Sequence, residues 1–144
     1  FACGLALGKK KKNEKGNIYV LLGDGECQEG TVWEAALFAS QHQLSNLVAI
    51  VDYNKKQSSG MIKNILDIEP INMKWKSFGW DSVEIDGHNI DELNSAITSK
   101  SLQPKMIIAN TIKGKKVSFL ENKEDCHYDR LSEEEAKIAW EAIS

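Results

Sequence analysis

The sequence predicts an α/β fold, with a mostly parallel sheet and helices on both of its faces. Two observations support this class. Segments 17–22, 47–51 and 105–109 are nearly continuous apolar runs, which is typical of strands that are buried on both sides. Between these runs lie segments whose apolar residues recur at helical spacing. Strands that alternate with helices favour a parallel sheet covered by helices.

The composition fits one globular domain over residues 1–144. Apolar residues make up 42 % of the chain and charged residues 27 %, which is typical of a globular protein rather than a disordered one. A net charge of −3 does not favour nucleic acid as a partner, and no apolar run approaches the roughly 20 residues that cross a bilayer. The 3 cysteines are widely spaced, which indicates reduced thiols in a cytoplasmic protein rather than a zinc site.

The first half of the chain can be assigned element by element. Residues 1–12 look like the end of a helix rather than the start of a domain, so we expect a domain that is truncated at its N-terminus. A strand at 17–22 ends at a glycine, and a helix follows from Thr31 to about Leu44. The strand at 47–51 then leads into a polar loop.

The second half repeats this alternation. Pro70 is expected to open a short helix that stops at Gly79, because proline is favoured at a helix start and glycine just beyond its end. The remaining elements, in order, are a strand at 82–85, a helix at 90–100, a strand at 105–109, a polar loop at 111–130 and a final helix at 132–143. We expect Trp140 to anchor that helix to the body, and the three earlier tryptophans to pack in the core.

Three loops, at 23–30, 54–60 and 111–128, follow the carboxyl ends of predicted strands, where ligands bind in open α/β sheets. In the first loop Asp24 stands between two glycines, which permit a sharp turn and the close approach of a ligand. The helix N-terminus that follows favours an anion there. A carboxylate beside a bound anion indicates a divalent cation between the two.

Asn54 follows the next strand along the chain. One helix and one strand return the chain to the same edge of the sheet, so the amide oxygen of Asn54 is expected beside the Asp24 carboxylate. Each residue alone is explained equally well or better as a helix cap or an ordinary loop residue. Together they indicate a site for a hard cation, which prefers oxygen ligands.

Gly23-Asp24-Gly25, a helix, a strand and Asn54 form the pattern of thiamine-diphosphate enzymes, and this sequence resembles the transketolase family in particular. The runs that carry the resemblance are 22–26, 28–30, 32–35, 46–50, 78–80, 86–88 and 111–114, together with His127. They extend over most of the chain, from about residue 17 to about residue 128. The resemblance implies a thiamine-diphosphate-binding fold, as the diphosphate-binding module or as a split N-terminal subunit.

The resemblance also implies roles for the residues of the first two loops. Asp24 and Asn54 match the side-chain ligands of a magnesium or calcium ion, and Lys56 falls where a backbone carbonyl completes the set. The cofactor-binding positions of the first loop are Gly23, Asp24, Gly25 and Glu26. Among these, Gly25 matches the glycine whose N–H meets the diphosphate.

Further roles follow for residues outside these loops. Lys113 and His127 match a lysine and a histidine that reach the diphosphate and the substrate side of the site, so His127 is a catalytic candidate. Glu29 is the second one, since it matches a glutamate buried between subunits in the network that links two cofactor sites. The alternatives are a solvated loop lysine for Lys113, a surface histidine for His127 and an ordinary acid in the first turn of a helix for Glu29. His88 also matches a family position, but a turn into a helix explains it better.

The implied reaction moves a two-carbon ketol unit from a ketose phosphate to an aldose phosphate, as in pentose phosphate metabolism. A pyrimidine-binding module or C-terminal subunit is then required as a partner, in a dimer or heterotetramer, and the isolated chain is expected to be inactive. One alternative is a related enzyme that acts on a 2-oxo acid, which Ser58 leaves open.

Another alternative is a non-catalytic fragment or pseudo-subunit. Three departures from the family pattern favour it: Lys116 replaces a common glycine, Cys126 a usual tryptophan and Tyr128 a usual glycine. A P-loop nucleotide binder is excluded, because the sequence has no GxxxxGK[ST] run.

Overall fold

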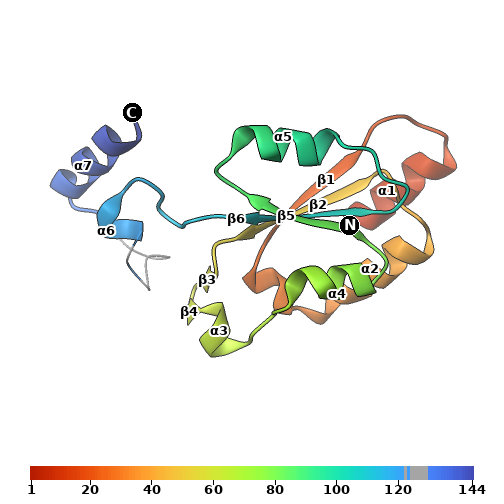
Figure 1. The fold of residues 1–144 in the computed structure, drawn as a ribbon, viewed down its shortest axis with the longest axis horizontal. Coiled ribbons are helices and arrows are strands. Elements are labelled where there is room, and N and C mark those ends of the chain that lie inside the picture. The colour runs from red at the N-terminus through yellow and green to blue at the C-terminus, as the bar shows by residue number, and fades with distance from the viewer. Residues whose placement is uncertain (122, 124–129) are drawn as a thin grey trace.

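The structure is a computed structural model, and it describes residues 1–121, 123 and 130–144. Its centre is a sheet of four parallel strands in the order β1-β2-β6-β5 (Figure 1). These strands are β1 (Ile18–Gly23), β2 (Leu47–Tyr53), β6 (Lys105–Asn110) and β5 (Asp81–Asp86). The predicted α/β class with a parallel sheet is therefore confirmed.

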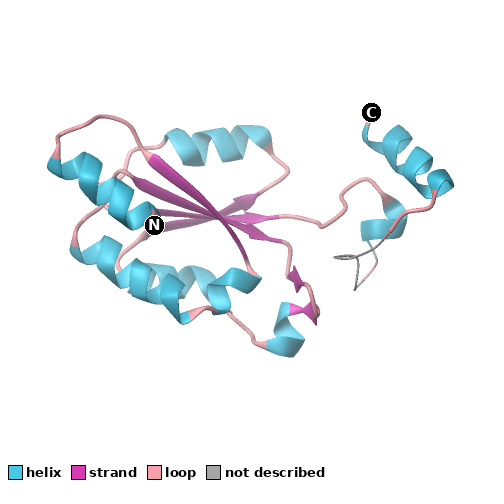
Figure 2. Ribbon diagram, turned by 180° about the vertical axis from the view of Figure 1, so that it is seen from behind, coloured by secondary structure: helices cyan, strands magenta, loops and turns pink. Residues whose placement is uncertain are grey.

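Helices cover both faces of the sheet, as predicted (Figures 1 and 2). One face carries α1 (Ala2–Lys11), α2 (Gly30–Gln41) and α4 (Ile71–Ser77), and the other carries α5 (Ile90–Thr98). Ala6 of α1, Ala36 of α2 and Trp75 of α4 form one buried core with Val51 and Ile108 of the central strands. Most of the hydrophobic core therefore lies on the side of the three helices.

The strands differ in burial according to their place in the sheet. β2 and β6 are central and almost completely buried, as their apolar runs predict. β1 is an edge strand, and on it Tyr19 is 54 % and Leu21 is 69 % exposed. The prediction that segment 17–22 is buried on both faces is therefore wrong. The reason is that α5 packs on β5 and β6, at the opposite edge of the sheet from β1.

An aromatic cluster joins α2, α4 and the start of β5. The ring of Trp75 lies 5.0 Å from that of Trp33 and 4.9 Å from that of Trp80, and Phe78 packs 5.2 Å from Trp33. The indole N–H of Trp80 donates to the carbonyl of Ala36 at 3.0 Å. The predicted packing role of the three earlier tryptophans is confirmed.

The connecting loops contain more regular structure than the sequence predicts. After β2 the chain forms a two-stranded hairpin, β3 (Lys56–Gln57) and β4 (Gly60–Met61), and then the short helix α3 (Ile62–Ile65). A one-turn helix, α6 (Ser118–Glu121), lies within the predicted polar loop at 111–130. Elements this short contain less than one full hydrophobic period, so periodicity does not reveal them.

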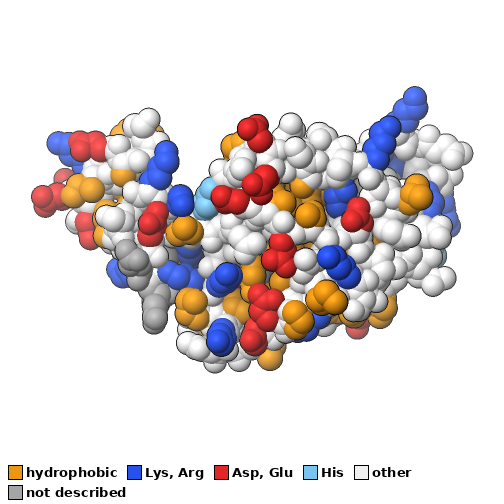
Figure 3. Space-filling model, in the orientation of Figure 1, with side chains coloured by type: hydrophobic (Ala, Val, Ile, Leu, Met, Phe, Trp, Pro, Cys, Tyr) orange, Lys and Arg blue, Asp and Glu red, His pale blue; other side chains and the backbone are white. Residues whose placement is uncertain are grey.

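The last helix, α7 (Glu133–Ile143), begins at the predicted capping box of Ser132 and Glu135. Our prediction that Trp140 anchors it to the body is wrong, because this side chain is 71 % exposed. α6 and α7 stand away from the sheet, and hydrophobic side chains lie among charged ones on their surface (Figures 1 and 3). Within the described part of the chain, no helix is long and apolar enough to span a membrane.

Candidate functional site

Asp24 lies at the carboxyl end of β1, where it is the N-cap of the 3-10 helix η1 (Gly25–Gln28). Its side chain is only 2 % exposed, and Oδ1 accepts a hydrogen bond of 2.8 Å from the N–H of Gly25. Burial raises the pKa of the Asp24 carboxyl, and the nearby Asp52 carboxylate raises it further, against the lowering effect of backbone N–H donors from Lys55 and Gly25. A buried carboxylate next to a second one is a favourable place for a cation.

The two glycines beside Asp24 have no left-handed backbone conformation. Neither Gly23 nor Gly25 has a positive φ, so a left-handed turn does not explain them. At Gly25 an added Cβ would lie 3.2 Å from the Cβ of Gln57, so space is limited there. The carboxylate of Glu26 accepts a hydrogen bond of 2.6 Å from the N–H of Gly23, and Glu26 thereby shapes the loop.

The loop after β2 meets the first loop directly. The backbone N–H of Lys55 donates to Oδ2 of Asp24 at 2.6 Å. Lys55 adopts a left-handed conformation with φ of 66°, which is uncommon for a residue with a side chain. Next to it, the amide oxygen of Asn54 accepts from the N–H of Lys56 at 3.0 Å. The structure therefore brings Asp24 and the Asn54–Lys56 segment to the same edge of the sheet.

Lys56 connects this edge to the third loop. Its ammonium group donates to the carbonyl of Lys123 at 2.7 Å and lies 3.4 Å from the carbonyl of Glu121. The side chain therefore points toward the end of α6. The predicted role of Lys56 belongs to its backbone carbonyl, so this direction of the side chain does not conflict with it.

The third loop starts beside β2 and β5. The N–H of Thr111 donates to the carbonyl of Tyr53 at 3.2 Å, and the N–H of Ile112 donates to Nε2 of His88 at 2.8 Å. Lys113 follows directly and is half-buried. The chain then turns at Gly114, whose φ is 73° and where an added Cβ would lie 2.7 Å from the Cβ of Leu120. Lys113 is therefore carried by a segment that is held on both sides.

The two catalytic candidates are placed differently. Glu29 lies just before α2, at its N-cap position, and its side chain makes no capping hydrogen bond. It is exposed in this chain. His127 lies outside the described residues, as do Cys126 and Tyr128. Lys116, the remaining departure from the family pattern, has a φ of 74° and so keeps a backbone conformation that glycine favours.

The residues at this edge fit a divalent cation with a diphosphate. No lysine or arginine nitrogen of the described residues forms an ion pair with Asp24, so its charge is available for a cation. The described residues contain no group of three or more His, Cys, Asp or Glu that could hold a metal. A carboxylate, an amide oxygen and a carbonyl would therefore leave the remaining positions around magnesium to phosphate oxygens. A buried oxygen without a hydrogen-bond partner, Oε1 of Gln57, lies beside Gly25.

Some residues of this edge were not singled out from the sequence. Asp52 is the sixth of seven residues in β2 and remains part of the strand rather than opening the loop. His88 was interpreted as a turn residue, and its turn is present, because its N–H donates to Oδ1 of Asp86 at 2.9 Å. What was missed is the contact of its ring with Ile112. Side-chain contacts between distant segments leave no periodic signal in the sequence.

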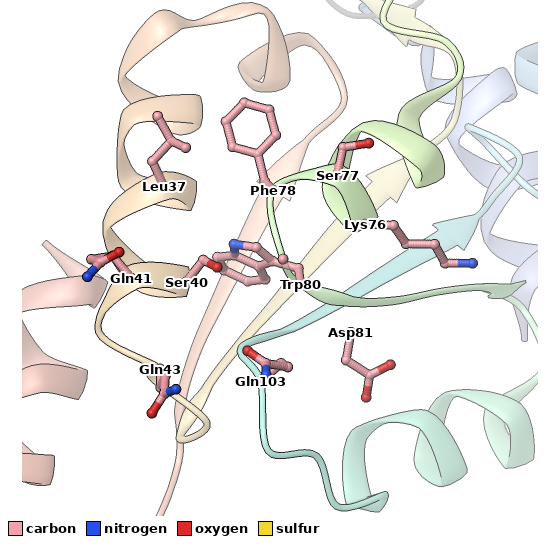
Figure 4. Close-up of a pocket in the computed structure, with 11 residues that line it drawn as sticks. Leu37, Ser40, Gln41, Gln43, Lys76, Ser77, Phe78, Trp80, Asp81 and Gln103 are labelled. Carbon is pink, nitrogen blue, oxygen red and sulfur yellow. The ribbon is translucent and has the colours of Figure 1, made fainter.

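A cavity of about 760 Å³ lies elsewhere. It is formed between the end of α2, the end of α4 and the start of β5, which is the amino end of the sheet (Figure 4). Ser40, Lys76, Asp81 and Gln103 are among the side chains that line it. Since ligands of open α/β sheets bind at the carboxyl ends of the strands, this cavity is not the candidate site.

Comparisons with known proteins identify the family of the chain. Residues 8–143 match the family described as transketolase, thiamine diphosphate binding domain. The chain is 46 % identical over 141 residues to SqwG, a 6-deoxy-6-sulfo-D-fructose transketolase subunit of Clostridium sp. (strain MSTE9), covering 96 % of this chain and 51 % of that protein. It is 41 % identical over 144 residues to one of the apulose-4-phosphate transketolase subunits of Actinobacillus succinogenes, covering 99 % and 52 %.

A solved structure gives the same result for the fold. The transketolase of Campylobacter jejuni superposes with a TM-score of 0.86 at 32 % identity, over 97 % of this chain and 23 % of that one. The chain spans about half the length of the two curated relatives. From its fold, its sequence and the matched range, the chain belongs to the transketolase family, as a thiamine diphosphate binding domain.

Proposed function

We propose that this chain binds the magnesium-diphosphate end of thiamine diphosphate in a transketolase whose other half binds the pyrimidine end. Two of its relatives are named as transketolase subunits, and the chain spans about half of each. The proposed reaction transfers a two-carbon ketol unit between sugar phosphates. The partner is a pyrimidine-binding module or C-terminal subunit, in a dimer or heterotetramer.

The contact between Asp24 and Lys55 carries this proposal. It places the buried carboxylate of Asp24 beside the segment that contains Asn54 and Lys56. In the proposed site the Asp24 carboxylate, the Asn54 amide oxygen and the Lys56 carbonyl hold magnesium or, alternatively, calcium. These are the hard oxygen ligands that both ions prefer.

The other site residues act on the cofactor and the substrate. Gly23, Gly25 and Glu26 shape the loop that faces the diphosphate, and Lys113 supplies a positive charge to it. In the structure the N–H of Gly25 already donates a hydrogen bond to the Asp24 carboxylate. The same N–H would therefore divide its hydrogen bond between this carboxylate and the diphosphate. We further propose that His127 acts on the substrate side of the site. The exposed Glu29 would meet the partner subunit.

The bound cofactor would supply the carbanion chemistry that breaks and forms the carbon–carbon bond. The contribution of this chain is binding and orientation. The buried carboxylate of Asp24 would hold the cation that binds the diphosphate of the cofactor. The pyrimidine end would then project toward the partner, which is why we expect the isolated chain to be inactive.

Calorimetric titration of the purified chain with thiamine diphosphate, with and without Mg²⁺, tests this proposal. We expect magnesium-dependent binding that is lost in Asp24→Ala and retained in Asp81→Ala, an exposed aspartate at the opposite end of the sheet. The same titration is repeated in the presence of a pyrimidine-binding partner. Absence of magnesium-dependent binding under both conditions would show that the chain is a non-catalytic subunit.

The donor substrate is tested on the complex with the partner. Cleavage of ketose phosphates supports the transketolase reaction. Cleavage of a 2-oxo acid, with ketose phosphates ignored, would instead support the alternative within the same cofactor class. The hairpin formed by β3 and β4, which contains Ser58, is the segment where we would expect the two specificities to differ.

A further inference from the structure

Asp52 is bound by side chains from two different loops. It lies at the carboxyl end of the central strand β2, in register with Gly23 of β1 and Ala109 of β6, and it is half-buried. Its Oδ2 accepts a hydrogen bond of 3.2 Å from the amide nitrogen of Asn54. Its Oδ1 accepts a hydrogen bond from the hydroxyl of Thr111. One carboxylate thus connects the second loop to the third.

The contact with Asn54 selects one orientation of the amide. An ionised carboxylate only accepts hydrogen bonds, so it binds the NH₂ end of the side chain. The oxygen end accepts from the N–H of Lys56 at 3.0 Å. If the amide were reversed, its oxygen would face the Asp52 carboxylate and its NH₂ group would face another donor, so both hydrogen bonds would be lost. Only the oxygen of an amide binds a hard cation, so this orientation matters for the site.

The contact with Thr111 holds the start of the segment that carries Lys113. Thr111 is also fixed through its N–H, which donates to the carbonyl of Tyr53 at 3.2 Å. Its methyl group fills the space above Gly87, where an added Cβ would lie only 2.5 Å from Cγ2 of Thr111. Hydroxyl, N–H and methyl group therefore each have a partner, and Lys113 follows two residues later.

We propose that Asp52 is a positioning residue that couples the cation ligands to the diphosphate-binding lysine. Through Oδ2 it turns the oxygen of Asn54 to the cation, and through Oδ1 it sets the distance between that ligand and Lys113. This inference rests on the proposed function of the site. It assigns to Asp52 a role through Asn54 and Thr111, with no contact of its own with the cofactor.

The test uses single substitutions of Asp52 and of Thr111. Asp52→Asn keeps the shape of the side chain, but its amide can donate as well as accept and no longer discriminates between the two ends of Asn54. Thr111→Val removes the hydroxyl and keeps the volume, whereas Thr111→Ser keeps the hydroxyl. Asp81→Asn is the matched control, since it makes the same chemical change at the amino end of the sheet.

The first readout is the set of side-chain NH₂ resonances of Asn54 in the nuclear magnetic resonance spectrum of the chain without cofactor. We expect them to shift or broaden in Asp52→Asn and to stay unchanged in Asp81→Asn. The second readout is calorimetric titration with thiamine diphosphate and Mg²⁺. Groups that orient metal ligands typically contribute about 10-fold to 100-fold to affinity, so we expect a loss of about that size in Asp52→Asn. A smaller loss is expected in Thr111→Val, and recovery in Thr111→Ser.

The proposed function of the chain and the positioning role of Asp52 can each fail without the other. If the wild-type chain binds no cofactor even with its partner present, the proposed function fails, while the Asn54 resonances still report the role of Asp52. If Asp52→Asn leaves both the resonances and the affinity of a binding-competent chain unchanged, the positioning role is overturned. A loss of affinity in Asp52→Asn that Thr111→Val and the Asn54 resonances do not share would overturn it as well, since Asp52 would then act as a direct ligand.

Discussion

The backbone N–H of Lys55 donates a hydrogen bond of 2.6 Å to Oδ2 of Asp24 and joins the loop after β1 to the loop after β2. The donor comes from a residue in the left-handed region, with a φ of 66°. The carbonyl of the same residue accepts from the N–H of Ile62 at 3.0 Å, which ties the loop to α3. The geometry of the candidate cation site therefore depends on one unusual backbone conformation.

Substitution of Lys55 tests this dependence. Lys55→Gly is expected to keep the conformation and to match or exceed the stability of the wild type, because a left-handed residue with a side chain costs about 1–2 kcal/mol. Lys55→Pro is expected to destabilise the chain by about 3 kcal/mol, since proline has neither the N–H nor access to a positive φ. Urea unfolding measures both. Equal stability of the two variants would contradict the role given to this hydrogen bond.

His88 is expected to hold the third loop through the Nε2 atom that accepts from Ile112. His88→Ala removes the acceptor, and a hydrogen bond of about 1 kcal/mol corresponds to about fivefold faster amide exchange at Ile112. His88→Gln places an oxygen near the same position and should restore part of the protection. Hydrogen exchange followed residue by residue gives the answer, with the amide of Thr111 as internal control. Unchanged exchange at Ile112 in the alanine variant would rule out the contact in solution.

Cys27 is expected to make folding stability fall at alkaline pH. It is 0 % exposed, and burial raises the pKa of its thiol from 9.0 to about 12, with smaller contributions from Asp24 and Glu26. Below pH 9 the thiol is protonated in both states. Above it the unfolded thiol ionises first, so stability is lost progressively up to the folded pKa, by about 1.4 kcal/mol at pH 10.

The measurement for Cys27 is the free energy of unfolding of the wild type and of Cys27→Ala at several pH values between 8 and 10.5. Cys27→Ala has a lower stability at every pH because it leaves a cavity. The quantity of interest is the difference between the two proteins, which should shrink as the pH rises. A constant difference would show that the thiol does not titrate differently in the two states.

The exposed Trp140 and the buried Trp75 should respond in opposite ways to substitution. Trp140→Ser is expected to change stability by less than about 0.5 kcal/mol, because the side chain is largely in water. Trp75→Ala is expected to cost about 3–5 kcal/mol, because Trp75 is buried and contacts both Trp33 and Trp80. Thermal unfolding distinguishes the two. A large loss in Trp140→Ser would mean that α7 packs on the body after all.

Lys105 is a buried lysine that holds the end of α5. Its ammonium group donates to the carbonyl of Ala96 at 2.8 Å and to both oxygens of Ser99, and burial lowers its pKa. Lys105→Met keeps most of the volume but leaves these acceptors without their donor, so we expect a loss of about 1–3 kcal/mol. Urea unfolding, with Lys100→Met on the exposed surface as control, measures it. Equal stability of Lys105→Met and the control would contradict this capping role.

Much of the candidate site followed from one rule of topology. Parallel strands end at the same edge of a sheet, so a glycine-flanked Asp24 after one strand and Asn54 after the next were expected to be neighbours. The hydrogen bond from Lys55 to Asp24 brings these loops together. The ligand roles of Asp24 and Asn54 remain predictions. The contacts of His88 with Ile112 and of Thr111 with Asp52 could not be predicted, because they join segments that are far apart in the sequence.

The sequence by itself determined the α/β class, the strands and the helices long enough to show a hydrophobic period, because local spacing of apolar residues reflects burial. Only the tertiary structure decided which strand lies at the edge, so the apolar run of β1 leaves Leu21 exposed. It also decided that Trp140 is exposed to solvent and that the Asp52 carboxylate accepts hydrogen bonds from two loops. Strand order and side-chain contacts between distant segments depend on the packing of the whole chain, which no local pattern contains.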